Sequence, residues 1–168
     1  MINYPNLSGA QPVYGMQPIN IVQSIVPTKA TQISVHFRAS NKKYVCAEGG
    51  GGKEIKANRG SAKGWETFKL ILLENDRLCH GGKVAISCEK GEFLSVVGSK
   101  LMCNKKSYMA SEIFTLIHPS GIGEIYSKNW ICLQTFEGKY VGYEKEGETL
   151  VCSNIITPKE MFKIKIVQ

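Results

Sequence analysis

Glu66-Thr67-Phe68, Glu112-Ile113-Phe114 and Glu160-Met161-Phe162 repeat one short pattern, Glu-x-Phe, three times along the chain. The three Phe residues are separated by 46 and 48 residues. A near-constant period over most of a sequence indicates one structural unit used three times. The repeat therefore predicts how the chain packs, whereas function has to be sought where the three copies differ.

Each copy of the pattern is preceded by an apolar pair, an aromatic residue and a small residue, all at even spacings within their segments. The pairs are Val35 and Phe37, Val84 and Ile86, and Ile131 and Leu133; the aromatics are Tyr44, Phe93 and Tyr140; the small residues are Cys46, Ser95 and Gly142. Even spacings place side chains on one face of an extended strand. Each unit is therefore predicted to form four short strands with one buried face.

Residues 31–168 are accordingly predicted to form an all-β domain, a β-trefoil of twelve short strands in three pseudo-repeats. A closed barrel of this kind protects the strand edges that an open sheet would expose. We expect the repeated Phe residues to form one layer of the core. The three Glu residues, being symmetric, are expected to brace the fold and not to act as an acid and a base.

The first 30 residues differ in composition from the rest. They contain four Pro residues, several Gln and Asn residues, and a single charged residue, Lys29. This composition predicts an extended or disordered Pro/Gln-rich tail over residues 1–30. Its apolar stretch, residues 19–26, could dock on the domain or on a partner.

The six cysteines are predicted to be reduced. Cys46, Cys103 and Cys152 occupy positions that Ser, Gly or Ala fill in the other units, as small buried residues would. The N-terminal residues lack a basic segment followed by an apolar one, which a secretory signal would require. Together these features predict a cytoplasmic protein, with a cortical location if it binds the cytoskeleton.

No enzyme chemistry, metal site or cofactor is expected from the motifs. The segment 49–53 resembles a phosphate loop, but Ala47 replaces its first Gly and Glu54 replaces the residue that would hold magnesium. Cys79 and His80 are adjacent in sequence, which does not orient a base towards a nucleophile. No Cys-x-x-Cys pair or zinc-finger spacing of His is present.

The net charge of +7 is concentrated in the first two units. A one-sided basic surface attracts acidic partners, among which we consider actin filaments, anionic lipid headgroups, nucleic acid and acidic glycans. A basic surface without any dedicated partner is the simpler alternative. Nucleic acid is the least favoured partner, because no recognised motif occurs and the basic residues are not interleaved with aromatics.

Three stretches of the first unit resemble the first unit of a fascin-like domain. They are residues 43–48 (Lys-Tyr-Val-Cys-Ala-Glu), 57–59 (Ala-Asn-Arg) and 64–68 (Gly-Trp-Glu-Thr-Phe). Residues 138–142 and 160–162 are similar to the repeat of the same family. The resemblance covers residues 31–168 and implies a β-trefoil that binds either actin filaments or carbohydrate.

Actin binding or crosslinking is the leading functional prediction. The candidate contact residues are Lys42, Lys43, Lys53, Lys56, Arg59 and Lys63. Fascins carry four trefoils and this chain has one, so bundling would require a homodimer, use of the tail, or two sites. Hisactophilin is also a single-domain actin binder of this superfamily, but it is rich in His, whereas only three His residues occur here.

Carbohydrate binding by a lectin-like module is the alternative prediction. Only the first unit has a Trp before its Glu-x-Phe pattern. Trp65 could stack on a sugar ring while Asn58 and Glu66 bind hydroxyl groups. The competing interpretation is that Trp65 caps the barrel and that Asn58 and Arg59 tie down a turn. The Gln-x-Trp signature of ricin-type lectins is absent from this region.

Overall fold

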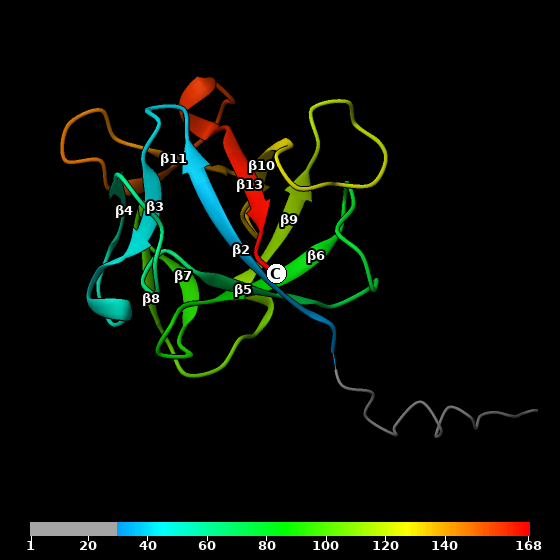
Figure 1. The fold of residues 1–168 in the computed structure, drawn as a ribbon, viewed down its shortest axis with the longest axis horizontal. Coiled ribbons are helices and arrows are strands. Elements are labelled where there is room, and N and C mark those ends of the chain that lie inside the picture. The colour runs from blue at the N-terminus through cyan, green and yellow to red at the C-terminus, as the bar shows by residue number, and fades with distance from the viewer. Residues whose placement is uncertain (1–29) are drawn as a thin grey trace, which may run out of the picture.

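The computed structural model describes residues 30–168, so the tail predicted for residues 1–30 lies outside the described residues except for Ala30. The described chain folds into twelve antiparallel strands and three short 3-10 helices (Figure 1). The strands are β2 (Gln32–Ala39), β3 (Tyr44–Ala47), β4 (Ile55–Arg59), β5 (Phe68–Leu72), β6 (Lys83–Ser87), β7 (Phe93–Val97), β8 (Lys100–Lys105), β9 (Ile113–Ile117), β10 (Trp130–Gln134), β11 (Tyr140–Tyr143), β12 (Leu150–Ser153) and β13 (Phe162–Ile166). The helices are η3 (Glu48–Gly50), η4 (Ala110–Glu112) and η5 (Pro158–Glu160). The predicted all-β class with twelve strands is confirmed.

The strands form where the sequence alternates between apolar and polar residues. In β2, Val35, Phe37 and Ala39 are buried, while His36 and Arg38 between them are only half-buried. The same alternation recurs in β13, where Phe162 and Ile164 are buried. A period of two places each strand with one face on the core and the other towards solvent.

The sheet closes on itself into a nine-strand barrel, in the order β11, β12, β8, β7, β6, β5, β2, β13 and β10. Within it, β9 pairs with both β6 and β10, so β2, β5, β6, β9, β10 and β13 also form a closed ring. β2 and β13 are joined over five residue pairs, from Phe162 opposite Ala39 to Ile166 opposite Val35. Closure leaves these strands without the free edge of an open sheet.

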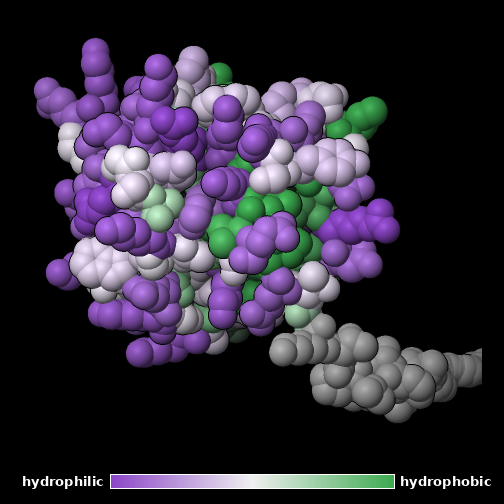
Figure 2. Space-filling model, viewed as in Figure 1, coloured by the Kyte–Doolittle hydropathy of each residue, from purple (hydrophilic) through white to green (hydrophobic). Residues whose placement is uncertain are grey.

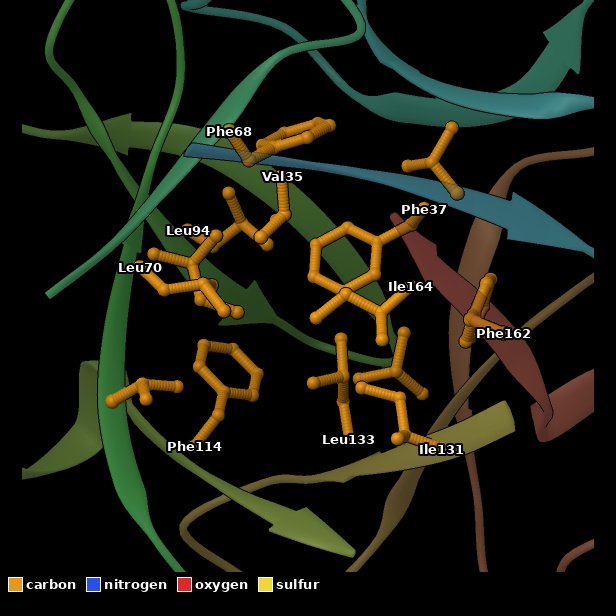
Figure 3. Packing of buried hydrophobic residues seen from close by; sticks show 14 of the residues in the cluster. Val35, Phe37, Phe68, Leu70, Leu94, Phe114, Ile131, Leu133, Phe162 and Ile164 are labelled. Atoms are coloured by element: carbon orange, nitrogen blue, oxygen red, sulfur yellow. The ribbon is translucent and has the colours of Figure 1, made fainter. Parts of the chain in front are cut away.

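The core lies inside the barrel and contains the residues that the repeat predicted. Phe68, Phe114 and Phe162 are each about 1% exposed, and the first and last pack against Phe37. Figure 3 shows these rings among aliphatic side chains from strands all around the barrel. The expectation that the repeated Phe residues fill the core is confirmed.

The three Glu residues of the repeat are buried and hold equivalent turns. Each accepts a hydrogen bond from the backbone N–H three residues earlier, which belongs to Lys63, Met109 or Thr157; these bonds are 2.8, 3.0 and 2.8 Å long. A buried carboxylate that binds backbone N–H groups replaces the water it has lost. The predicted bracing role is thus seen in all three units.

All six cysteines are unpaired in the structure. Cys46, Cys88, Cys103 and Cys132 are buried. Burial, together with a hydrogen bond to Glu66, raises the pKa of the Cys46 thiol to about 12. This thiol therefore stays protonated at neutral pH and behaves as a packing group.

The surface is largely hydrophilic in the view of Figure 2, with one hydrophobic area near β13, β9 and β6. No helix within residues 30–168 has the length and apolar character needed to cross a membrane.

Candidate functional site

The first unit carries a groove walled by an exposed tryptophan. It lies between the loop that joins β4 to β5 and the turn that joins β6 to β7, and has a volume of about 420 Å³. Its lining residues are Arg59, Ser61, Lys63, Gly64, Trp65, Glu66 and Glu89. The Trp65 side chain is 42% exposed, although an indole gains more from burial than almost any other side chain. We call this site the Trp65 groove.

Two glycines allow the walls of the Trp65 groove to approach closely. A β-carbon on Gly50 would lie 3.1 Å from Glu89 Oε1 and 3.2 Å from Trp65 Nε1. A β-carbon on Gly64 would lie 2.6 Å from Glu89 Oε2. The Glu89 carboxylate and the indole N–H therefore converge on backbone that has no side chain of its own.

The Glu89 carboxylate has no partner within residues 30–168. It is exposed, and the described residues make neither a hydrogen bond nor an ion pair with it. A carboxylate is an acceptor of several hydrogen bonds, so Glu89 offers free acceptor capacity beside an aromatic wall. On its other side, Gly64 and Glu89 line an adjoining groove of about 350 Å³ that reaches Ser87 and Gly91.

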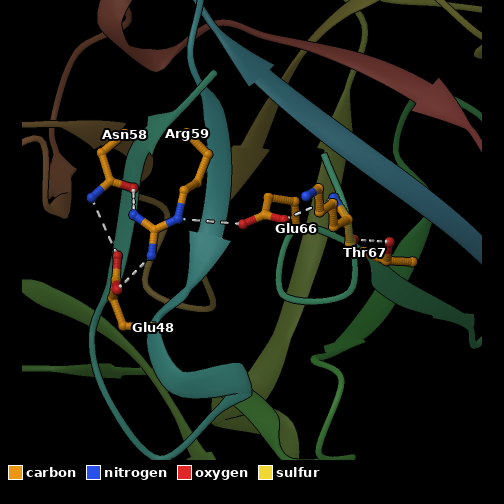
Figure 4. A network of polar contacts seen from close by, with 6 residues as sticks. Glu48, Asn58, Arg59, Glu66 and Thr67 are labelled. Atoms are coloured by element: carbon orange, nitrogen blue, oxygen red, sulfur yellow. Dashed lines mark hydrogen bonds and ion pairs between the residues drawn. The ribbon is translucent and has the colours of Figure 1, made fainter. Parts of the chain in front are cut away.

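The opposite wall is held by an ion-pair network centred on Arg59 (Figure 4). The Arg59 Nη2 atom lies 2.9 Å from Glu48 Oε1, and its Nε atom lies 3.6 Å from Glu66 Oε1. Arg59 Nη1 donates to Asn58 Oδ1 at 2.8 Å, and Asn58 Nδ2 donates to Glu48 Oε2 at 3.3 Å. A guanidinium held by two carboxylates and an amide fixes the β4 end of the groove.

The predicted glycan-binding residues are separated by this network. Trp65 and Glu66 line the groove, whereas both polar atoms of the Asn58 side chain are engaged by Glu48 and Arg59. Glu66 is only 4% exposed and accepts a hydrogen bond from the Lys63 N–H. The groups free to bind hydroxyls in the groove are therefore those of Ser61, Lys63 and Glu89.

The predicted actin-binding residues are distributed over both ends of the β3–β4 hairpin. Lys42 and Lys43 lie in the turn before β3, whereas Lys53 lies in the loop between η3 and β4. Lys56 lies 3.4 Å from Glu54, and Arg59 is paired with Glu48 and Glu66. The remaining four, Lys42, Lys43, Lys53 and Lys63, form no ion pair within residues 30–168 and are exposed.

Cys79 and His80, the adjacent pair considered for catalysis, make their side-chain hydrogen bonds with other residues and not with each other. The Cys79 Sγ accepts from Asn75 Nδ2 at 3.4 Å, and the His80 Nδ1 accepts from the His118 N–H at 3.1 Å. The described part of the chain also contains no cluster of three His, Cys, Asp or Glu side chains able to hold a metal ion.

Glu89 is the site residue that the sequence analysis missed. It belongs to the second unit, yet its side chain lies beside Gly64 of the first unit, which is 25 residues earlier in the sequence. Periodicity identifies the faces of strands, not the partner that a turn residue meets in the next unit. The nearest signal was the cluster of four glycines at positions 49–52, which a close approach of other groups would explain.

His36 connects β2 to the loop that carries Trp65. Its Nε2 lies 3.0 Å from Thr67 Oγ1, and Thr67 Oγ1 donates to the Lys63 carbonyl at 2.6 Å. Burial, and then the positive charge of Lys165, lower the pKa of His36 below its ordinary value of 6.5; Glu66 opposes this in part. The fold therefore favours neutral His36.

Acidification is expected to destabilise the domain partly through His36. Because folding lowers the pKa of His36, this residue contributes to the free energy of unfolding above pH 6.5. That contribution is lost as the pH falls through the lowered pKa of the folded state. His36→Gln, which can still bind Thr67, should show a smaller loss of unfolding free energy between pH 7.5 and pH 5. Urea unfolding at both pH values measures this, and an equal loss in both proteins would contradict it.

Comparisons with known proteins place the fold and correct the family assignment. A Caenorhabditis elegans protein of unknown function, solved by structural genomics, superposes with a TM-score of 0.66 at 14% identity, covering 80% of this chain and 94% of that one. The SDF2-like protein from Arabidopsis thaliana superposes with a TM-score of 0.64 at 10% identity, covering 82% and 94%. No curated protein sequence matches the chain.

The resemblance to a fascin-like β-trefoil is wrong. The similar structures include an SDF2-like protein, and the observed sheet closes into a nine-strand barrel. The physical reason is that the matching residues serve general structural roles: Phe68 fills the core, Glu66 braces a turn, and Asn58 and Arg59 bind Glu48. The profile of a family described as a domain of unknown function, DUF7910, matches residues 29–121. The chain belongs to the DUF7910 family.

Proposed function

We propose that this domain is a non-enzymatic carbohydrate-binding module that takes a neutral sugar in the Trp65 groove. The observation that supports this most is the indole of Trp65, 42% exposed, beside the unpaired Glu89 carboxylate in a groove of about 420 Å³. Sugars present apolar C–H faces and a rim of hydroxyl groups. An aromatic wall with a few free polar groups fits both.

The charges of the groove favour a neutral ligand over an acidic one. The Arg59 guanidinium is already paired with Glu48 and Glu66, which leaves Lys63 opposite the unpaired Glu89. One ammonium donor and one carboxylate acceptor can both bind hydroxyl groups. An anionic sugar would meet the Glu89 carboxylate at the same place and be repelled.

The test is titration of the full chain with neutral oligosaccharides, using cello-, laminari-, xylo- and mannohexaose as probes. At least one should bind, and Trp65→Ala should weaken it about tenfold, since a stacked sugar covers several tens of Å² of the indole. Trp130→Ala is the matched control. Trp130 is 38% exposed in β10 and lies under the Lys163 ammonium, outside the groove.

Isothermal titration calorimetry gives the affinities. Binding that is equal in wild type and Trp65→Ala would remove Trp65 from the site. Absence of heat with all four probes would contradict the proposal.

Gly64→Ala should weaken sugar binding while leaving the fold intact. The new β-carbon would lie 2.6 Å from the Glu89 carboxylate, and this exposed, flexible side chain would swing away. We expect the free energy of unfolding to change by no more than about 0.5 kcal/mol. The affinity for the bound hexaose should fall, as we also expect for Glu89→Gln, since both changes remove the carboxylate from its place in the groove. Unchanged affinity would show that the position of Glu89 does not matter.

Binding to filamentous actin is the second proposal. It is supported by two exposed lysines, Lys42 and Lys43, which form no ion pair with an acidic side chain among residues 30–168. Its support is weaker, because Lys56 and Arg59 are engaged by the domain's own carboxylates. Salt-sensitive co-sedimentation with actin filaments, lost in a Lys42→Glu, Lys43→Glu double variant, would support it. No pelleting at low or moderate salt would exclude it.

We also propose that the nine-strand barrel is a β-trefoil outside the fascin family. Supporting this, six strands form an inner ring and the remaining six pair as the hairpins β3–β4, β7–β8 and β11–β12. The turns at 39–42, 88–91 and 135–138 also repeat one hydrogen-bond pattern. An experimental structure in which the three units superpose by a threefold rotation would bear this out.

A further inference from the structure

We propose that a second sugar-binding groove, at Phe136, lies one unit further round the barrel from the Trp65 groove. This inference rests on the proposed carbohydrate-binding function and extends it to a bivalent module. Its basis is a cavity of about 200 Å³ at the position structurally equivalent to the Trp65 groove.

The equivalence of the two positions follows from their backbone contacts. The Trp65 groove is built from the turn braced by Glu66 and the turn at 88–91, where the Cys88 N–H donates to the Glu92 carbonyl at 2.9 Å. The second position has the turn braced by Glu112 and the turn at 135–138, where the Thr135 N–H donates to the Lys139 carbonyl at 2.7 Å. In both turns the fourth residue is a Gly with positive φ whose N–H donates back to the first residue at 2.9 Å.

The two positions differ in which of their two turns supplies the aromatic side chain. Ser111 stands where the first unit has Trp65, because each directly precedes the bracing Glu. Phe136 stands where the second unit has Glu89, because each is the second residue of its turn. Each groove thus has one aromatic wall, but the aromatic is supplied from opposite sides.

Phe136 is exposed to an extent that packing does not explain. Its side chain is 63% exposed and lines the cavity together with Val96, Gly98, Ser111, Thr135 and Glu137. Val97, which lies between Val96 and Gly98 in the β7–β8 hairpin, is 51% exposed. An apolar surface next to a hollow is the usual setting for a ligand contact.

Polar groups with free hydrogen-bonding capacity surround this aromatic. Thr135 is only 6% exposed, and its Oγ1 accepts from the Lys139 N–H at 3.1 Å. Its hydroxyl proton has no acceptor among residues 30–168, which is costly for a buried group unless a ligand or water accepts it. The Glu137 carboxylate, exposed at the mouth, forms no ion pair or hydrogen bond with the described residues.

These groups match the chemistry of the Trp65 groove. A ring face can stack on Phe136, a hydroxyl oxygen can accept from Thr135, and a hydroxyl proton can be donated to Glu137. The smaller volume suits one sugar residue, whereas the Trp65 groove and its adjoining groove together can take more than one. Two sites on one rigid barrel would bind an insoluble polysaccharide more tightly than either site alone.

The test is an ¹H–¹⁵N NMR titration of the full chain with the same four neutral hexaoses. For a hexaose that binds, two groups of amides should shift, at residues 60–66 with 88–91 and at residues 96–98 with 135–138. Phe136→Ala should abolish the second group of shifts and lower the calorimetric stoichiometry from two to one. Trp65→Ala should weaken binding about tenfold at the first group of amides and leave the second group unchanged.

The outcomes separate this inference from the proposed function. If only the first group of amides shifts, and Phe136→Ala leaves binding unchanged, the second groove is overturned while the Trp65 groove stands. If only the second group shifts, the Phe136 groove is supported and the Trp65 groove is overturned. Absence of any shift with all four probes overturns both.

Discussion

Phe162→Ala is expected to lower the free energy of unfolding by about 3–5 kcal/mol. The ring is about 1% exposed and packs edge-on against Phe37, with ring centroids 6.4 Å apart. Phe37 also contacts Phe68, so the cavity would open in the layer that all three units share. Because strands of a closed barrel cannot move inwards independently, little of the cavity should collapse. Urea unfolding followed by circular dichroism measures the change.

Phe136→Ala is the matched control for this substitution. It removes the same side chain from a position that is 63% exposed, and should change the unfolding free energy by less than about 0.5 kcal/mol. Similar losses in the two variants would mean that Phe162 does not belong to the stabilising core.

Gly142→Ala is expected to destabilise the domain by about 3 kcal/mol, at the upper end of the usual cost of overpacking. A β-carbon there would collide with Glu160 Oε1 and would lie 2.9 Å from Glu160 Cδ. Glu160 cannot swing away as Glu89 can, because it is only 4% exposed and its Oε2 accepts from both the N–H and the hydroxyl of Thr157. The added carbon would therefore strain the backbone of β11 or break the turn at η5.

Cys46→Ala provides the comparison for Gly142→Ala. It leaves the same alanine at the equivalent position of the first unit, where a β-carbon is already accommodated beside Glu66. We expect it to cost about 1 kcal/mol through the lost sulfur contacts. The melting temperature of Gly142→Ala should therefore be well below that of Cys46→Ala. Equal melting temperatures would contradict the steric explanation.

The core of this domain was predictable because it obeys a local rule. Phe68, Phe114 and Phe162, and the apolar pairs that precede them, recur at even spacings, and a strand converts even spacing into one buried face. The small residues Cys46, Ser95 and Gly142 occupy one repeated position of the sequence pattern. The reason for Gly142 is the Glu160 side chain, which only the structure reveals.

The candidate site was less predictable, because it is assembled from two units. Trp65 was singled out by its sequence as the only tryptophan that precedes a Glu-x-Phe copy, whereas Glu89 reaches it from the following unit. Asn58 appeared available in the sequence, but its amide is occupied by Glu48 and Arg59. Side-chain pairing of this kind depends on how turns meet in space, and sequence periodicity contains no information about it.

The family resemblance failed for a related reason. Glu66 and Phe68, two of the residues that carried the resemblance, act in this barrel as the brace of a turn and as a core residue. Their recurrence indicates a shared architecture and does not identify a lineage or a ligand.

The pairing of β2 with β13 also has a consequence for synthesis of the protein. The barrel cannot close until residue 166 has left the ribosome, which at ordinary elongation rates is on the order of ten seconds after residue 32. Until then, one edge of β2 and the nascent edges of later strands have unsatisfied backbone groups that can pair with another chain. The period of greatest aggregation risk therefore lasts until β13 can pair with β2, and chaperones that act on the newly made chain would have their largest effect on yield in this interval.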